Sequence, residues 1–147
     1  MHKIRDWLYI GGYRDTADLD LLQTAGVGSM LQLADHRPQP GIATLPIIID
    51  DGVPVSADKL ALGIAYVRGE KALGKSVLVA CGAGISRSTT FAIGVLKEEE
   101  GGTVLETFLN IRKHHPNALP HISLWHSLCQ YYGEDTLYQE IWQHLRK

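Results

Sequence analysis

The apolar positions of this chain fall into two patterns that alternate along it. Short runs rich in apolar and β-branched residues predict buried strands, at residues 7–10, 27–33, 45–49 and 76–80. Apolar residues spaced three and four apart predict helices, at residues 15–25, 57–73, 86–100, 121–131 and 134–145 and in a segment that starts at Thr103. Strands that alternate with helices predict an α/β layered fold whose central sheet, of four or five strands, is mainly parallel.

Local signals mark the ends of several of these segments. Gly26 is a helix stop, and Thr103 followed by Glu106 is a capping-box pattern that starts a helix. The chain contains no internal repeat and no low-complexity linker. We therefore expect residues 1–147 to form a single domain.

Composition narrows the functional classes. The chain has 14 Lys and Arg against 16 Asp and Glu, a formal net charge of −2, whereas a protein that binds polyanions carries a basic surplus or stripe. We find no apolar run of the roughly 18 residues that a membrane span needs and no signal-peptide pattern. Two cysteines do not make a disulfide framework, so we expect a reducing, cytoplasmic setting.

The most informative segment is a buried strand that leads into a glycine-rich loop and then a helix, Val77-Leu-Val-Ala-Cys-Gly-Ala-Gly-Ile-Ser-Arg-Ser88. Ligands bind at the carboxyl ends of strands in an open α/β sheet. Successive loop amides can form an anion nest, which the N-terminus of the following helix strengthens. Arg87 adds a planar fork that matches two oxygens of a tetrahedral anion. The segment predicts a phosphate or sulfate site made by Gly82, Ala83, Gly84, Ile85, Ser86 and Arg87.

Cys81 stands at the floor of this predicted nest. The field that attracts an anion also stabilises a thiolate, and a thiolate under a phosphorus atom is placed for in-line attack. The Ser88 hydroxyl can hydrogen-bond the sulfur when it leaves in a second step. These parts predict a covalent thiophosphate that is then hydrolysed, without a metal or other cofactor. A structural interpretation, with Cys81 as a packed small hydrophobe, does not explain the coincidence with Arg87.

The chemistry also requires a proton donor for the leaving oxygen. Asp50 and Asp51 follow the strand predicted at 45–49, where they can lie beside the anion loop if the two strands are neighbours. From the residues alone, a catalytic role and a role as turn formers are equally supported. Asp35, after the strand predicted at 27–33, is a weaker third candidate.

Other reactive side chains are interpreted as structural or peripheral. Cys129 lies within a predicted helix and is interpreted as a core residue. The pair His114-His115 has no neighbouring Cys or carboxylate cluster that would complete a metal site, so we expect a solvated helix end. His36 and Arg37 lie in a loop from which they could flank the pocket and contact substrate.

The quoted residues resemble the dual-specificity branch of the protein tyrosine phosphatases. The signature of that family is His-Cys-x5-Arg followed by Ser or Thr, and the positions of this chain that match it are Cys81, Gly84, Ser86, Arg87 and Ser88. Similarity extends over most of the chain, through Trp7-Leu-Tyr-Ile-Gly-Gly and residues 19–33, 45–51 and 108–128.

The resemblance implies a small, atypical dual-specificity catalytic domain with the protein tyrosine phosphatase-like fold. It implies Cys81 as nucleophile, Arg87 as phosphate ligand and Asp51, ahead of Asp50, as general acid, while Ser88 assists departure of the thiolate. The implied partner is a protein or peptide that carries phosphotyrosine, with phosphoserine and phosphothreonine as further substrates. No nucleic-acid or membrane partner is expected.

Two departures from the family pattern bear on this expectation. Ala80 replaces the signature His, which in the family helps to orient the loop and tune the thiolate. Because backbone amides supply most of the nest, we expect the nest to persist. His121 stands where the family often has Asn. The loop also lacks the lysines of the phosphoinositide phosphatases, which argues against a highly charged lipid substrate.

Two other classes of function use the same features. One is a phosphate-recognition module without turnover, which the missing His favours and the intact Cys81 and Arg87 oppose. The other is a rhodanese-like or arsenate-reducing enzyme, for which Cys129 is the available resolving thiol. Phosphates on a nucleotide, an RNA 5′ end, a sugar or a lipid are the alternative, non-protein substrates.

Overall fold

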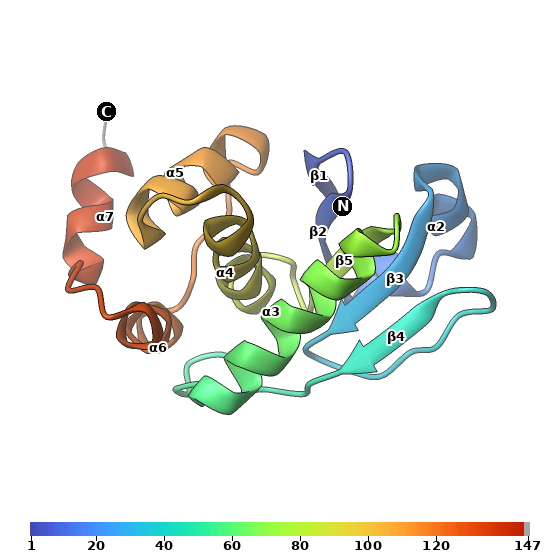
Figure 1. Ribbon diagram of the computed structural model, residues 1–147, viewed down its shortest axis with the longest axis horizontal. Helices are drawn as coiled ribbons and strands as arrows, with labels where there is room; N and C mark the ends of the chain where they lie inside the picture. The colour runs from blue at the N-terminus through green and yellow to red at the C-terminus, as the bar shows by residue number, and fades with distance from the viewer. Residues whose placement is uncertain (146–147) are drawn as a thin grey trace.

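A five-stranded sheet forms the centre of the computed structural model, which describes residues 1–145 (Figure 1). The last two residues of the predicted domain, 146 and 147, lie outside the described residues. The strand order is β1-β2-β5-β3-β4. Only the β1–β2 pair is antiparallel, so the predicted α/β class with a mainly parallel sheet is confirmed. The strands are β1 (His2–Arg5), β2 (Leu8–Gly12), β3 (Val27–Gln32), β4 (Ala43–Pro46) and β5 (Ser76–Cys81).

Helices cover both faces of this sheet. One face packs on a helix near the N-terminus, and the other face packs on the larger group of helices that follows β4 (Figure 1). The helices of the described residues are α1 (Tyr13–Thr16), α2 (Leu19–Ala25), α3 (Ala57–Ala72), α4 (Arg87–Glu100), α5 (Val104–His114), α6 (Ile122–Tyr132) and α7 (Tyr138–Leu145).

Alternation along β5 decides which side chains reach each layer. Successive strand residues point to opposite faces. Leu78 and Ala80 therefore pack in the smaller layer with Leu22 of α2, whereas Val79 and Cys81 belong to the larger core. The alanine at the position of the signature His is thus buried in an apolar cluster, on the face opposite Cys81.

Three predicted segments differ from the structure by more than two residues at one end. The strand predicted at 45–49 is wrong in its bounds, because β4 ends at Pro46, whose nitrogen carries no hydrogen to donate. The residues after Pro46 remain close to the end of β3 through isolated hydrogen bonds. One of these runs from the Ile49 amide to the carbonyl of Leu33, the residue after β3, at 3.0 Å. The helix predicted at 15–25 is two helices, since the Asp18 carboxylate caps α2 by accepting the Leu21 amide at 3.0 Å. The helix predicted at 134–145 begins only at Tyr138.

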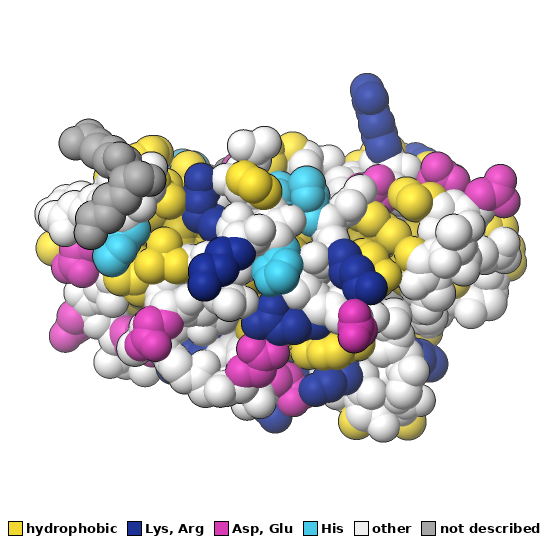
Figure 2. All heavy atoms as spheres, turned by 90° about the horizontal axis from the view of Figure 1, so that it is seen from above, with side chains coloured by type: hydrophobic (Ala, Val, Ile, Leu, Met, Phe, Trp, Pro, Cys, Tyr) yellow, Lys and Arg dark blue, Asp and Glu magenta, His cyan; other side chains and the backbone are white. Residues whose placement is uncertain are grey.

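Acidic and basic side chains are interspersed on the surface. Figure 2 shows one face of the molecule, on which Lys and Arg side chains lie near Asp and Glu side chains. Arg68, for example, pairs with Glu98 at 3.0 Å and with Glu99 at 3.3 Å. In residues 1–145, none of the helices has the length and apolar character needed to cross a membrane.

Candidate active site

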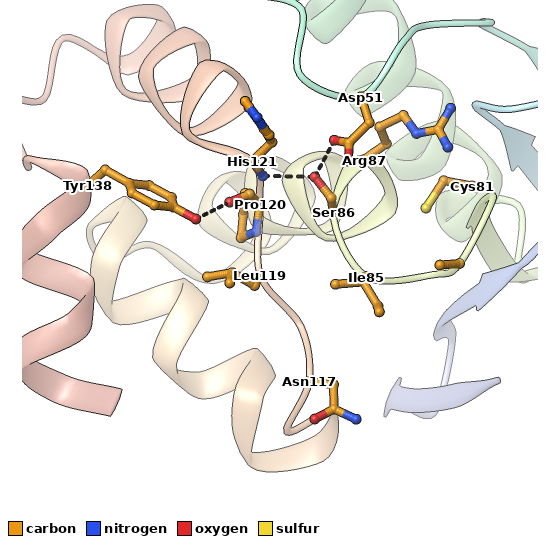
Figure 3. Close-up of a pocket in the computed structure, with 11 residues that line it drawn as sticks. Asp51, Cys81, Ile85, Ser86, Arg87, Asn117, Leu119, Pro120, His121 and Tyr138 are labelled. Carbon is orange, nitrogen blue, oxygen red and sulfur yellow. Dashed lines mark hydrogen bonds between the residues drawn. The ribbon is translucent and has the colours of Figure 1, made fainter. Parts of the chain in front are cut away.

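The loop after β5 forms the floor of a pocket of about 380 Å³ (Figure 3). Cys81, the last residue of β5, lines it with its Sγ 3.2 Å from the Ser88 hydroxyl of α4. Beyond β5, the loop and the first residue of α4, the lining comes from three separate parts of the chain: the segment after β4, the α5–α6 connection and α7. The lining residues are Asp51, Cys81, Ala83, Ile85, Ser86, Arg87, Asn117, Leu119, Pro120, His121 and Tyr138.

Glycines allow this loop to fold tightly against the end of β2. Gly84 adopts a φ of +73°, and a Cβ there would lie 2.7 Å from the carbonyl carbon of Gly11. A Cβ on Gly12 would lie 2.8 Å from the Gly82 carbonyl oxygen. A side chain at either position would push the loop away from the sheet. The predicted use of glycine for close backbone approach is thus seen at Gly84.

Arg87 bends back from the first turn of α4 over the loop. Its Nη2 would lie 2.9 Å from a Cβ on Gly82, so the absence of a side chain at Gly82 leaves room for the guanidinium. Its Nη1 donates to the Ile49 carbonyl at 3.0 Å. One side chain therefore connects the anion loop to the segment that carries the candidate general acids.

Ser86 makes the second connection between these segments. Its hydroxyl donates to Asp51 Oδ1 at 2.6 Å and accepts the amide of His121 at 2.8 Å (Figure 3). Ser86 is the N-cap residue of α4, but its side chain makes no capping bond. Because the hydroxyl is turned to Asp51, it leaves the first amides of α4 available to an anion.

The structure separates the three candidate acids. Asp51 lines the pocket with Cys81, whereas Asp50 lines a different hollow with Val53 and Pro54. The Asp35 carboxylate accepts the amide of His36 at 2.8 Å and does not line the pocket. Of the three, Asp51 alone lies where it could reach a phosphate held over Cys81.

The start of α6 holds the segment that carries Asp51. Ser123 Oγ donates to the Gly52 carbonyl at 3.2 Å, and Ser127 Oγ accepts the Val55 amide at 3.1 Å. The His121 ring lies next to Gly52, 3.5 Å from where a Cβ would stand. These contacts from α6, together with the hydrogen bond from Ser86, hold the segment that carries Asp51 from two sides.

Two pocket or loop residues escaped the sequence prediction. No signal in the sequence pointed to Tyr138, which lines the pocket and donates to the Pro120 carbonyl at 2.8 Å. Partial burial, and then the charge of Asp51, raise the pKa of the Tyr138 hydroxyl. The prediction of a solvated helix end at His114-His115 is wrong for His115, which is 2% exposed and lies 2.6 Å from the Gly84 carbonyl through Nε2. Two adjacent histidines carry no periodicity that tells which one points inward.

The loop residues proposed to flank the pocket do not line it. The Arg37 guanidinium lies over the Tyr13 ring, 4.1 Å from its centre, and His36 lies near Thr44. Cys129 is a core residue of α6, as its helical position suggested. Burial, and then neighbouring carboxylates, raise the pKa of its thiol to about 12.

The comparison with known families settles the class of this domain. Residues 8–134 match the dual specificity phosphatase catalytic domain. The chain belongs to this family. The resemblance drawn from the signature residues is therefore confirmed.

Several proteins of this family are similar to the chain. It is 29% identical over 131 residues to dual specificity protein phosphatase 16 of Homo sapiens, covering 84% of this chain and 19% of the relative. It is 28% identical over 133 residues to dual specificity protein phosphatase 2 of Mus musculus, covering 87% of this chain and 42% of the relative. The chain thus spans less than half the length of these relatives.

Solved structures share the fold. Human DUSP28 superimposes with a TM-score of 0.84 at 23% identity, covering 90% of this chain and 96% of that one. A mouse putative dual specificity phosphatase complexed with zinc tungstate gives a TM-score of 0.81 at 26% identity, covering 88% and 84%. The protein tyrosine phosphatase-like fold is therefore confirmed.

Proposed function

We propose that this chain is a cysteine-dependent phosphatase that hydrolyses phosphate monoesters on protein phosphotyrosine, with phosphoserine and phosphothreonine as further substrates. In this proposal residues 1–147 act as one catalytic domain in a reducing, cytoplasmic setting, without a metal ion. The supporting observation is that Cys81, Arg87 and Asp51 line one pocket although they come from three different elements. The hydrogen bonds from Ser86 to Asp51 and from Arg87 to Ile49 hold these elements together.

The first step transfers the phosphoryl group to Cys81. Loop amides of residues 82–87 and the Arg87 fork bind the equatorial oxygens, where charge accumulates in the transition state. The Cys81 thiolate attacks phosphorus as the ester P–O bond breaks. Protonated Asp51 gives its proton to the departing tyrosine oxygen. The products are the substrate protein with an unphosphorylated tyrosine side chain and a cysteinyl phosphate at Cys81.

The second step releases inorganic phosphate. The Asp51 carboxylate accepts a proton from a water molecule that attacks phosphorus on the side opposite Cys81. The S–P bond breaks and the sulfur takes the electron pair. The Ser88 hydroxyl, 3.2 Å from Sγ, donates to the sulfur and stabilises it as a leaving group.

The walls of the pocket favour an aromatic phosphoester. Ile85, Leu119 and Tyr138 contribute apolar and aromatic surface to the pocket that Cys81 lines, and packing of a phenyl ring on such surface is favourable. The mouse relative that superimposes at 26% identity is described as complexed with zinc tungstate, and tungstate is a tetrahedral oxyanion. That description supports an oxyanion site in this chain.

Hydrolysis of p-nitrophenyl phosphate tests the proposal. We expect Cys81→Ser to abolish turnover and the matched variant Cys129→Ser to retain it, because only Cys81 lies under the nest. Turnover that survives Cys81→Ser would refute the mechanism. A wild-type chain that binds a phosphotyrosyl peptide without hydrolysing it would instead be a recognition module.

A further inference from the structure

Three carbonyl groups of the loop are held by donors outside the loop. The Gly82 carbonyl accepts the Tyr13 amide at 3.0 Å, and the Ile85 carbonyl accepts the Leu119 amide at 3.0 Å. The third, Gly84, accepts from a side chain, His115 Nε2, at 2.6 Å. Two of these three hydrogen bonds come from main-chain amides. The third comes from the His115 side chain, so a substitution at this position can remove it.

The direction of a carbonyl determines the direction of the next amide. A peptide unit is planar and trans, so its C=O and N–H point in opposite directions. Carbonyls that are bonded on the outer side of the loop turn the following amides toward its inner side. Those amides belong to Ala83, Ile85 and Ser86, all of which line the pocket over Cys81. The outer anchors thus shape the anion nest.

The Gly84–Ile85 peptide has particular need of such an anchor. Gly84 has a φ of +73°, and glycine has a wider range of backbone conformations than residues with a Cβ, so the peptide after Gly84 can rotate more readily than the peptide after Ile85. Ala80 occupies the position of the family's signature His, and its methyl group is buried in the layer on the other face of the sheet. Ala80 offers no polar atom to hold the loop.

The ring of His115 is fixed where it can serve this purpose. A carbonyl only accepts, so Nε2 carries the hydrogen. The ring is 2% exposed and stacks on His2 of β1 at a centroid distance of 3.7 Å and 13° between planes. The main chain on both sides is also bonded, from the His115 amide to Ile111 and from the Ala118 amide to His115. The donor is therefore preorganised.

We propose that His115 is the positioning residue that keeps the Ile85 amide directed at the bound phosphate. The inference rests on the proposed function, because it assigns a role in the same oxyanion site. His115 acts through the Gly84 peptide and takes no part in bond breaking.

Competitive inhibition of p-nitrophenyl phosphate hydrolysis by inorganic phosphate measures the effect. His115→Phe keeps an aromatic ring for the stack on His2 but removes the donor. We expect the inhibition constant for phosphate to rise about tenfold, the size of one hydrogen bond to a charged group. His115→Gln, which keeps a donor, should recover most of the affinity. The same change at the neighbouring exposed residue, His114→Phe, is the matched control and should have no effect.

The outcomes separate the possible failures. A folded His115→Phe that binds phosphate as the wild type does overturns the inference, and a loss of melting temperature alone indicates a merely structural role. If the phenylalanine variant does not fold, His115→Met gives the same readout, since methionine fills irregular space without a donor. In the wild type, the Ile85 amide should become protected from hydrogen exchange on addition of phosphate; an unaffected amide also overturns it. A wild type that binds no phosphate contradicts the proposed function itself.

Discussion

Cys81 and Cys129 are both free, both buried and placed in opposite chemical surroundings. Cys81 ends the central strand β5, next to the N-terminus of α4 and to Arg87. Cys129 lies within α6, where burial raises the pKa of its thiol to about 12 and the carboxylates of Glu134, Asp135 and Glu140 add to the rise. The two buried cysteines therefore differ in their polar neighbours: Cys81 shares a pocket with Arg87, whereas Cys129 lies near carboxylates and does not line that pocket.

The same contrast bears on the rival interpretations of the sequence. An arsenate-reducing or sulfur-transfer enzyme that used both cysteines would need Cys129 to form a thiolate and to approach Cys81. Cys129 does not line the pocket, and its sulfur lies 3.8 Å from the Thr136 carbonyl. Its surroundings oppose ionisation, so we favour the phosphatase over the enzyme with a resolving thiol.

The largest expected effect is selective alkylation of Cys81. At pH 7, a thiol with a pKa of about 12 is ionised in about one molecule in 10⁵. We expect iodoacetate, which reacts with thiolates and carries a negative charge, to modify Cys81 within minutes and to leave Cys129 unmodified. Mass spectrometry of peptides after a timed quench measures both sites in one sample.

Two additions sharpen this measurement. Inorganic phosphate should protect Cys81, because it competes for the nest. Cys129 should react only after denaturant exposes it. Equal labelling of Cys81 and Cys129 in the native protein would show that their different surroundings do not change the reactivity of the two thiols.

The second largest effect is expected on kcat when the carboxylate that shares the pocket with Cys81 is removed. Asp51→Asn should lower kcat for a phosphotyrosyl peptide by about 10²-fold or more, the usual loss on removing a general acid, with little change in KM. The loss should be smaller for p-nitrophenyl phosphate, because p-nitrophenolate leaves without a proton. Steady-state kinetics on both substrates measures the ratio.

Matched carboxylates provide the controls. Asp50→Asn changes the adjacent residue outside the pocket, and Asp135→Asn changes an acid near Cys129. Both should keep kcat close to the wild-type value. If Asp50→Asn lowered kcat as much as Asp51→Asn does, the assignment of Asp51 as the general acid would be contradicted.

The smallest of these effects is expected for Ser88→Ala. Removing a hydroxyl 3.2 Å from Sγ takes a hydrogen bond from the departing thiolate, which should slow the second step by about 10- to 100-fold, as expected for a bond to a charged group. Rapid-quench kinetics should show a burst of p-nitrophenol followed by a slow steady state. A variant that slows the burst itself would place Ser88 in the first step instead.

Much of the fold and the centre of the site were predictable from local signals. The alternation of β-branched runs with helically spaced apolar residues predicted the α/β class. The run from Val77 to Ser88 predicted a strand, an anion loop and a helix, because these residues are adjacent in the chain and act on one another directly. The edge strand β1 gave no such signal, since Ile4 is its single buried residue.

Contacts between distant segments could not be predicted in this way. The position of Asp51 in the pocket, with Asp50 outside it, depends on the bond from Ser86 and on α6, which lies some 70 residues further along the chain. Tyr138 reaches the pocket because α7 packs beside the α5–α6 connection. Apolar periodicity places a helix face toward the core but does not say which distant side chains meet there.

The sequence by itself determined the strand, loop and helix that hold Cys81 and Arg87, because a thiol, a glycine-rich turn and a guanidinium that follow one another along the chain stay close together when this segment folds. Only the tertiary structure decided that Asp51 shares a pocket with Cys81 and that His115 contacts the Gly84 carbonyl. Those partners come from other elements, and packing of the sheet and helices alone brings them within hydrogen-bonding distance.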